Sequence, residues 1–410
     1  MQPRDAFAGP VRHVYVHVPF CAARCDYCDF YSEVVPLRRA EGGAPEPAKP
    51  AASAPLDRFV DAVSTEWELE RAAHEVHGVR TLYFGGGTPA LLGVGRLERL
   101  YQAFAAQLTA HAEVTVETNP DEADEAFAVW AARRDVRISL GVQSFLPRMR
   151  AALGRRPAAD PSAAVRRLRA AGVRDISVDL IHGIPGQTAD DVDHDLVVLA
   201  DLAPDHVSWY ELDVVPGTPL ARRHPQVPSD DERAALYRQV VRGLERLGYR
   251  WYEVSNFARP GRRARHNVAY WRARPYLGLG PGAVSTVGGR RWRDAADVAD
   301  YVAALDPSPR DLPSPQDLSS PRDPSSPREP SPPPREVESL GRETLARERL
   351  MLAARCGSAV PLADVRPVLD PGAVAPLVAA GLLSLHSGRI RVTRKGRYVG
   401  DEVCVRLFRA

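Results

Sequence analysis

Short runs of apolar and β-branched residues alternate along the first half of the chain with longer segments in which apolar residues recur every three or four positions. The short runs are typical of strands and lie at residues 13–18, 79–84, 113–118, 136–142, 175–181 and 206–212. The longer segments predict helices at residues 56–76, 123–134, 161–172 and 190–202. This repeated alternation predicts a parallel sheet with crossover helices, either a barrel or a doubly wound sheet.

Other segments break this pattern. Residues 36–55 are rich in Ala, Pro and Glu and predict an exposed insertion. The Pro/Ser-rich segment 306–336 has too few large apolar residues to form a core, so it predicts a disordered, partly polyproline linker. The tail, 337–410, combines helical patterns with a β-wing that has glycine at its turn. It predicts a small winged-helix-like α+β module.

The charge of the chain is nearly balanced, with 54 basic and 52 acidic residues and a net charge of +2. This balance gives no global field for nucleic acid, so no nucleic-acid partner is expected. Lys49 and Lys395 are the only lysines, and neither lies in a sequence suited to a phosphate-binding loop or a pyridoxal phosphate site. No apolar run is long enough for a membrane span and no secretory signal is evident, so we expect a cytoplasmic protein.

Three cysteines, Cys21, Cys25 and Cys28, follow the first predicted strand in the spacing C-x3-C-x2-C. Three thiolates on one short loop can bind three irons of a [4Fe–4S] cluster and leave the fourth iron open for another ligand. The alternative is a structural zinc site, in which His13 or His17 would supply the fourth ligand. Both histidines alternate with Tyr15 on the strand, which suits the lining of a barrel better.

The segment YVHVPFCAARCDYCDF resembles the cluster motif of the radical S-adenosylmethionine (SAM) superfamily. More narrowly, it resembles the branch that contains oxygen-independent coproporphyrinogen III oxidase and the heme chaperone HemW. The resemblance implies an incomplete (β/α)6 TIM-like barrel formed by residues 1–250, with residues 251–305 as an extension over its mouth. We expect the C-terminal module to pack against that mouth. The implied cofactors are a [4Fe–4S] cluster, held by the three cysteines, and SAM at its open iron.

The same resemblance implies which residues contact SAM. The glycine-rich FGGGTP segment supplies Gly86, Gly87 and Thr88, while Tyr15 and Tyr27 line the site. Polar residues near the ends of later strands complete it: Glu117, Gln143, Arg155 and Asp179. A buried aspartate in a strand needs a polar partner, and Arg155 is our candidate partner for Asp179.

Two classes of function fit this scaffold, a decarboxylating oxidase and a heme carrier, and whether the protein is an enzyme stays open here. The oxidase resembles C-x3-C-x2-C-x-C, whereas this chain has Phe30 at the last position. The segment RHNVAYW resembles the chaperone's HNxxYW heme motif, which makes His266 the expected heme ligand. The chain departs from that branch at Ala264 and Val284, where cysteine and histidine are common. The carrier is therefore favoured, with heme and unidentified acceptor proteins as partners; transient membrane contact would be compatible with heme transfer.

Overall fold

The computed structural model describes residues 6–35, 37–39, 45–47, 53–155, 159–306 and 331–409. Most of the predicted linker and much of the predicted insertion lie outside these residues. Of the insertion, the structure describes a short antiparallel pair of strands, β4 (Leu37–Arg39) and β5 (Pro45–Pro47). Among the described helices, none is both long enough and apolar enough to cross a membrane.

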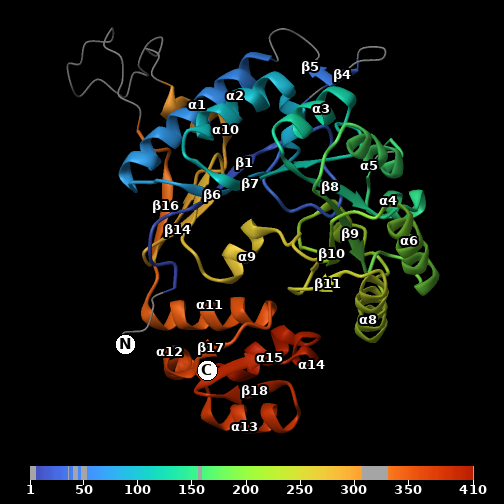
Figure 1. Ribbon diagram of the computed structural model, residues 1–410, viewed down its shortest axis with the longest axis vertical. Coiled ribbons are helices and arrows are strands. Elements are labelled where there is room, and N and C mark those ends of the chain that lie inside the picture. Colours follow the sequence, from blue (N-terminus) through green and yellow to red (C-terminus); the bar gives the residue numbers. More distant parts are fainter. Residues whose placement is uncertain are drawn as a thin grey trace.

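A nine-stranded sheet forms the centre of the molecule (Figure 1), in the order β11-β12-β10-β9-β8-β7-β6-β1-β13. All six predicted strands are confirmed as neighbours in it and run parallel. They are β1 (His13–Val18), β6 (Val79–Gly86), β7 (Leu108–Thr118), β8 (Arg137–Gln143), β9 (Ile176–His182) and β10 (His206–Glu211). Strand β13 (Leu277–Leu279) pairs parallel with β1, whereas β12 (Asn256–Ala258) and β11 (Arg250–Trp251) are antiparallel additions beyond β10. The outermost described strands, β11 and β13, do not pair with each other. The barrel is therefore incomplete, as the resemblance implies.

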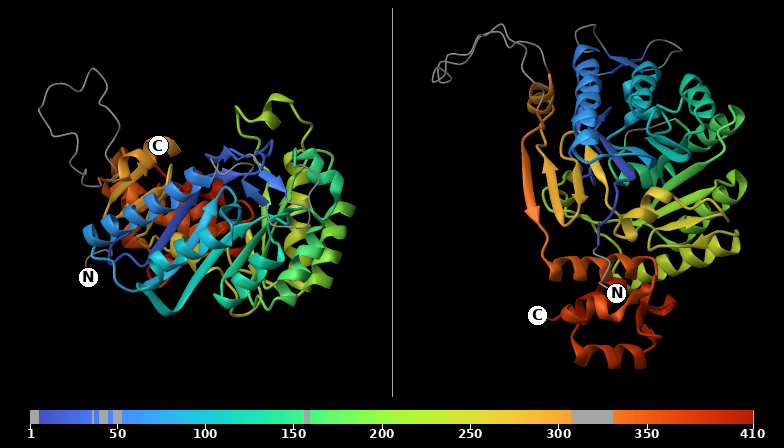
Figure 2. Two further views of the ribbon diagram at one scale, coloured as in Figure 1. Left: turned by 90° about the horizontal axis from the view of Figure 1, so that it is seen from above. Right: turned by 60° about the vertical axis from the view of Figure 1, so that its left-hand side comes forward.

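Helices cover the outside of this sheet (Figures 1 and 2). The four predicted ones are confirmed as α1 (Ser53–Ala73), α3 (Glu125–Arg133), α5 (Pro161–Ala170) and α6 (Ala189–Leu202). The helices α2 (Val94–Ala105), α4 (Pro147–Ala152), α7 (Pro219–Arg222), α8 (Asp230–Arg246), α9 (Arg265–Trp271) and α10 (Val298–Leu305) complete this part of the chain. Short strands β2 (Phe20–Cys21), β3 (Glu33–Val34), β14 (Val284–Val287) and β15 (Arg290–Asp294) lie outside the main sheet.

Strand β1 shows how the pattern of side chains creates both a core and an interior site. Val14, Val16 and Val18 are completely buried in the main apolar cluster. The alternate positions carry His13, Tyr15 and His17 and therefore point to the other face of the sheet, the barrel interior. This confirms that the two histidines line the barrel.

The extension after β12 divides between the two ends of the barrel. The start of α10 lies at the mouth, where Val298 donates its backbone N–H to the Tyr31 hydroxyl just beyond the cysteines (3.1 Å). Helix α9 lies at the opposite end, because its first N–H groups donate to Glu113 of β7 (2.9 Å each), near the N-terminal ends of the strands. The prediction that the whole extension covers the mouth is therefore wrong for the HNxxYW segment, which closes the floor.

The C-terminal module has its own apolar core and a three-stranded sheet, in agreement with the winged-helix-like prediction. Its elements are α11 (Arg342–Arg355), β17 (Val360–Pro361), α12 (Leu362–Val365), α13 (Pro371–Ala379), β18 (Leu383–His386), β19 (Arg389–Val392), α14 (Arg394–Arg397) and α15 (Gly400–Leu407). It lies below α9 in Figure 1 and at the bottom of the right-hand view of Figure 2, at the floor of the barrel.

Arginines hold this module in place. Arg394 pairs with Glu245 at the end of α8 (2.7 Å), and Arg397 lies 3.8 Å from the centre of the Trp251 ring. Arg355 lies 5.0 Å from the ring centre of Trp271, the last residue of α9. The expectation that the module packs against the mouth is wrong, because these acidic and aromatic partners lie at the floor.

Strand β16 (Arg335–Ser339) pairs antiparallel with β15, so the predicted linker ends earlier than residue 336. Arg335 is 16% exposed and contacts Glu66 (3.1 Å), Glu70 (2.8 Å) and Asp294 (2.6 Å). Composition does not reveal this strand, because it begins directly after the Pro-rich segment. It is held in place by the contacts of Arg335 with buried carboxylates that are distant in sequence.

Candidate functional site

The loop that carries the cysteines is fixed at both of its sides. After β1 it is held by the glycine-rich end of β6, where Gly87 donates to Val18 O (2.8 Å) and Thr88 to Phe20 O (2.7 Å). In the middle, Asp26 donates its N–H to Leu153 O and pairs with Arg223 (2.8 Å). A Cβ on Gly154, which has φ +68°, would lie 2.1 Å from the Asp26 carboxyl carbon. The sequence LGRRP thus needs glycine to admit the loop.

The glycines of FGGGTP allow a close approach of backbone to backbone. A Cβ on Gly87 would lie 2.5 Å from Phe20 O and 2.8 Å from Val18 O, and one on Gly86 would lie 2.4 Å from the His17 ring. The N–H groups of Gly86, Gly87 and Thr88 all donate within the protein. These N–H groups are therefore already used in hydrogen bonds. Of the backbone groups of Gly86 and Gly87, only the carbonyl oxygens could accept a hydrogen bond from an ammonium group.

A chain of polar side chains links the cysteine loop to the next strands. Asn119 donates to the Thr88 hydroxyl (2.9 Å) and accepts from Arg155 (2.5 Å). Burial raises the pKa of the Cys21 thiol to about 11, although a hydrogen bond with Thr88 acts in the opposite direction. Burial also opposes the charge of Arg155, but the neighbouring Tyr27 and Cys25 raise its pKa overall. Thr88 and Arg155 therefore contact the cysteine loop directly.

Glu117 lies in the barrel interior beside the glycine segment. Its carboxylate accepts from the Tyr83 hydroxyl (2.7 Å) and from the backbone N–H of Gly86 (3.0 Å). Burial raises its pKa to about 7, and the nearby Asp179 acts in the same direction, against the two hydrogen bonds. A carboxylate poised in this way can accept from a cationic ligand and can also carry a proton.

The predicted pairing of Arg155 with Asp179 is wrong. Asp179 accepts from Ser139 on the neighbouring strand (2.7 Å) and from Ser177 on its own strand (3.3 Å). Arg155 instead donates to Asn119 and to the carbonyl of Gly141. The hydroxyls satisfy Asp179 because β8 and β9 are in register with Gly141 opposite Asp179. Burial raises the pKa of Asp179 despite these bonds.

The remaining predicted SAM residues lie around the same interior. Tyr15 is bonded to His17 Nδ1 (3.0 Å) and its ring is 6.0 Å from that of Tyr83. Tyr27 packs beside a separate apolar cluster at the mouth. Gln143 follows a break in register between β8 and β9 and has φ +68°, a strained conformation for a side chain other than glycine. Its amide nitrogen would lie 3.3 Å from a Cβ on Gly141, which places it beside Arg155.

His266 lies at the floor, apart from these residues. It is 2% exposed, and its Nδ1 is 2.8 Å from the Thr81 hydroxyl, near the start of β6. Its Nε2 is buried and has no hydrogen-bond partner. The rings of Tyr83 and Tyr270 pack against it at 5.1 and 4.8 Å. A macrocycle can therefore reach Nε2 only if neighbouring groups move, and the assignment of His266 as heme ligand stays a prediction.

Two interior residues, Tyr83 and Asn119, were not among the predicted site residues. Both were open to inference from the period of two in a strand. Tyr83 precedes Gly87 by four residues, and Asn119 follows Glu117 by two residues in VETNP. Each therefore faces the same side as a residue that was selected.

The donor groups suit the implied cofactors. Cys21, Cys25 and Cys28 are half-buried free thiols on one loop, so each can bind a separate iron of a cluster. Within the described residues, no three Cys, His, Asp or Glu side chains form a group that could hold a single metal ion. Three thiolates that bind separate irons do not need to converge in that way. Gly86 and Gly87 have no side chains and so leave room beside the loop, and the interior carboxylate of Glu117 supplies negative charge for a cationic ligand there.

Known proteins match most of this chain. Residues 15–198 match the Radical SAM superfamily and residues 340–399 match the HemN C-terminal domain. The heme chaperone HemW of Mycobacterium tuberculosis (strain H37Rv) is 36% identical over 399 residues, which cover 95% of this chain and 93% of that protein. HemW of Lactococcus lactis is 34% identical over 304 residues, covering 72% and 75%.

A solved structure supports the fold. Coproporphyrinogen III oxidase (HemN) from Escherichia coli, a radical SAM enzyme, superposes with a TM-score of 0.74 at 22% identity. The match covers 97% of this chain and 89% of the oxidase. At this identity the likeness shows a common architecture only. With the family matches and the long HemW alignments, the chain belongs to the HemW family of the radical SAM superfamily.

Proposed function

We propose that this protein binds heme and delivers it to acceptor proteins, and that it holds a [4Fe–4S] cluster and SAM at the mouth of its barrel. The proposed binding and delivery of heme is supported by the family, because relatives that match most of the chain are named heme chaperones. The acceptor proteins are unidentified, and a cytoplasmic location and brief contact with a membrane during transfer belong to the same proposal.

The observation that carries the proposal is the separation of the two ends of β6. Thr81, near its start, contacts His266 of the HNxxYW segment, whereas Gly87, just past its end, contacts the cysteine loop. Six residues of strand span roughly 20 Å. A tetrapyrrole held at the floor is therefore too far from the cysteines for direct radical abstraction from its propionates. This arrangement suits a carrier better than a decarboxylase.

Phe30 supports the same choice. It occupies the position at which the oxidase motif has a further cysteine, and it is 61% exposed. The loop therefore presents an apolar side chain to solvent where the oxidase would present a thiol.

At the mouth, Cys21, Cys25 and Cys28 would hold the cluster, and Glu117 with the carbonyls of Gly86 and Gly87 would orient SAM. Cluster and SAM together supply one-electron chemistry when bound. The residues of this chain keep the thiols in place, exclude water from the Cys21 side and provide a carboxylate for the SAM ammonium group.

An anaerobic assay tests the proposal. Reconstituted protein with SAM and a strong reductant is given either heme or coproporphyrinogen III, and heme binding and protoporphyrinogen formation are measured together. We expect heme binding, release to an apo-hemoprotein and no porphyrinogen turnover. Decarboxylated product above that of a Cys25→Ala control would refute the carrier proposal in favour of the oxidase.

A further inference from the structure

A cavity of about 640 Å³ opens at the floor of the barrel, on the side of α9 that faces the starts of β1 and β6. Its volume is within the range of ligand cavities, roughly 300–1,000 Å³. Alanine, proline and valine form its apolar wall. Its polar lining is dominated by six arginines: Arg12, Arg80, Arg263, Arg265, Arg272 and Arg274.

Most of these arginines have no carboxylate partner among the described residues. Arg265 lies 3.6 Å from Glu113, and Arg263 lies over the Tyr252 ring at 5.5 Å. Arg12 is half-buried and Arg80, Arg272 and Arg274 are exposed at the rim of the cavity, and none of the four forms an ion pair within the described part of the chain. Guanidinium groups collected without counter-ions around one cavity favour an anion, and their planar donors match carboxylates.

An imidazole faces the same cavity. His13 is half-buried in the lining, and its Nδ1 bonds to the Thr81 hydroxyl (2.9 Å). The same hydroxyl bonds to His266 on its other side. The Thr81 hydroxyl has one proton, so it accepts from Nδ1–H of one ring and donates to Nδ1 of the other. The ring that donates from Nδ1 keeps Nε2 free as a ligand atom, and of these two rings only His13 lines the cavity. Burial, followed by Arg274, Arg80 and Arg12, lowers the pKa of His13 to about 4, so the ring is neutral near pH 7.

We propose that this cavity is the heme-binding site of the protein, with the two propionates held by the unpaired arginines and His13 Nε2 facing the iron. The inference rests on the proposed heme-carrier function and adds the place and the residues. It moves the iron contact from the buried His266 to a ring that a ligand can reach without displacing Tyr83. His266 then acts through Thr81 as a positioning residue for His13.

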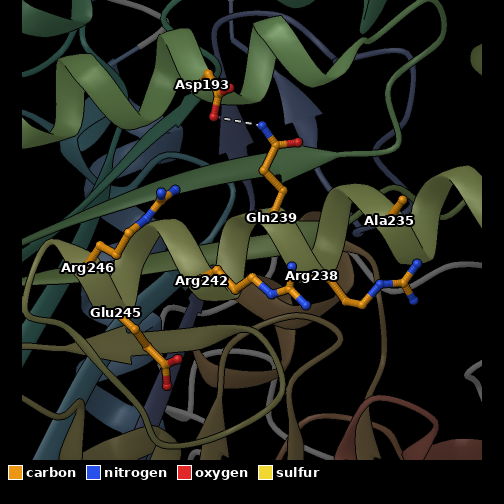
Figure 3. Close-up of a pocket in the computed structure, with 7 residues that line it drawn as sticks. All are labelled: Asp193, Ala235, Arg238, Gln239, Arg242, Glu245 and Arg246. Carbon is orange, nitrogen blue, oxygen red and sulfur yellow. Dashed lines mark hydrogen bonds between the residues drawn. The ribbon is translucent and has the colours of Figure 1, made fainter.

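The test is a heme titration, followed through the Soret band, on the full chain and on a triple variant, Arg12→Gln/Arg80→Gln/Arg274→Gln. The surface of α8 offers a matched control, because Arg238, Arg242 and Arg246 recur there every fourth residue along a hollow on the outside of the molecule (Figure 3). The control triple, Arg238→Gln/Arg242→Gln/Arg246→Gln, changes the net charge equally. We expect the cavity triple to raise the Kd at least about tenfold, in line with lost charged hydrogen bonds, and the control to leave it unchanged.

Two further ligands separate the contributions of carboxylates and iron. Metal-free protoporphyrin IX should lose affinity in the cavity triple but not in His13→Ala. Heme dimethyl ester, which lacks free carboxylates, should lose affinity in His13→Ala but not in the cavity triple. Circular dichroism melting curves of each variant identify any that fail to fold, and Arg274→Gln alone is then the substitute for the triple.

The possible failures are distinguishable. Wild-type protein that binds no heme refutes the proposed function itself. Wild-type binding that survives in the cavity triple and in His13→Ala, but is lost in His266→Ala, refutes the cavity and returns the ligand to α9. An equal loss in the cavity and control triples also refutes it, because general charge would then explain the binding.

Discussion

Gly87→Ala is expected to displace the cysteine loop from the end of β6, although all the cysteines are still present. The new Cβ would lie 2.5 Å from Phe20 O and 2.8 Å from Val18 O, and both neighbours are backbone atoms that no side-chain rotation can remove. The segments must separate by about 1 Å to reach an ordinary carbon–oxygen contact. Overpacking of this kind costs about 1–3 kcal/mol. Strain on the bonds Gly87 N–Val18 O and Thr88 N–Phe20 O adds about 1 kcal/mol.

The assay compares iron and sulfide content per chain after anaerobic reconstitution, together with thermal unfolding of the apo-protein. A cost of about 2–4 kcal/mol lowers the Tm of a barrel of this size by roughly 3–6 °C, and we expect iron content to fall further than stability alone explains. Gly95→Ala is the matched control, because its Cβ in α2 meets nothing within 4 Å. Wild-type iron content and SAM affinity in Gly87→Ala would refute the view that this glycine seats the loop.

The other predictions follow from the interior carboxylates, the floor and the linker. SAM affinity should fall as pH drops through about 7, because Glu117 becomes protonated there; Glu117→Gln should weaken binding at pH 8 and flatten this profile in a calorimetric titration. Tyr83→Phe should weaken SAM binding and spare heme binding, since it loses the hydroxyl bond to Glu117 and keeps the ring against His266. Arg335→Met should cost about 3–5 kcal/mol in urea unfolding, because buried carboxylates lose their cation, and Arg335→Lys should cost less. Replacing residues 307–330 by a shorter Gly/Ser linker should leave iron content and heme binding unchanged if this segment is only a connection.

The sequence predicts the parallel strands well because each carries a local pattern. Valines at alternate positions of β1, and glycine or proline after several strands, mark where strands begin and end. The cysteine loop and the FGGGTP turn were placed for the same reason, since each directly follows a strand. The positions of these motifs could be predicted because the carboxyl ends of all strands in a parallel sheet meet at one edge.

The errors concern positions that depend on neighbours distant in sequence. Asp179 pairs with Ser139 because strands β8 and β9 adopt one register, and a register is not written in either strand alone. The HNxxYW helix lies at the floor because β13, which follows it, runs parallel to β1 and so begins at the floor. The C-terminal module also lies at the floor, where Arg355 packs on the ring of Trp271 in α9.

One strand connects the two ends of the molecule. Thr81 of β6 bonds to the histidines of the floor, and the glycines at its end hold the cysteine loop. Between them Tyr83 contacts both, with its ring against His266 and its hydroxyl on Glu117. A change in the charge of Glu117, as a cationic ligand binds, acts on the Tyr83 hydroxyl and thus on a ring that packs over the floor histidine. This contact gives cofactor binding at the mouth a direct physical route to the floor, where the arginine-lined cavity lies, even though the two sites are too far apart for shared chemistry.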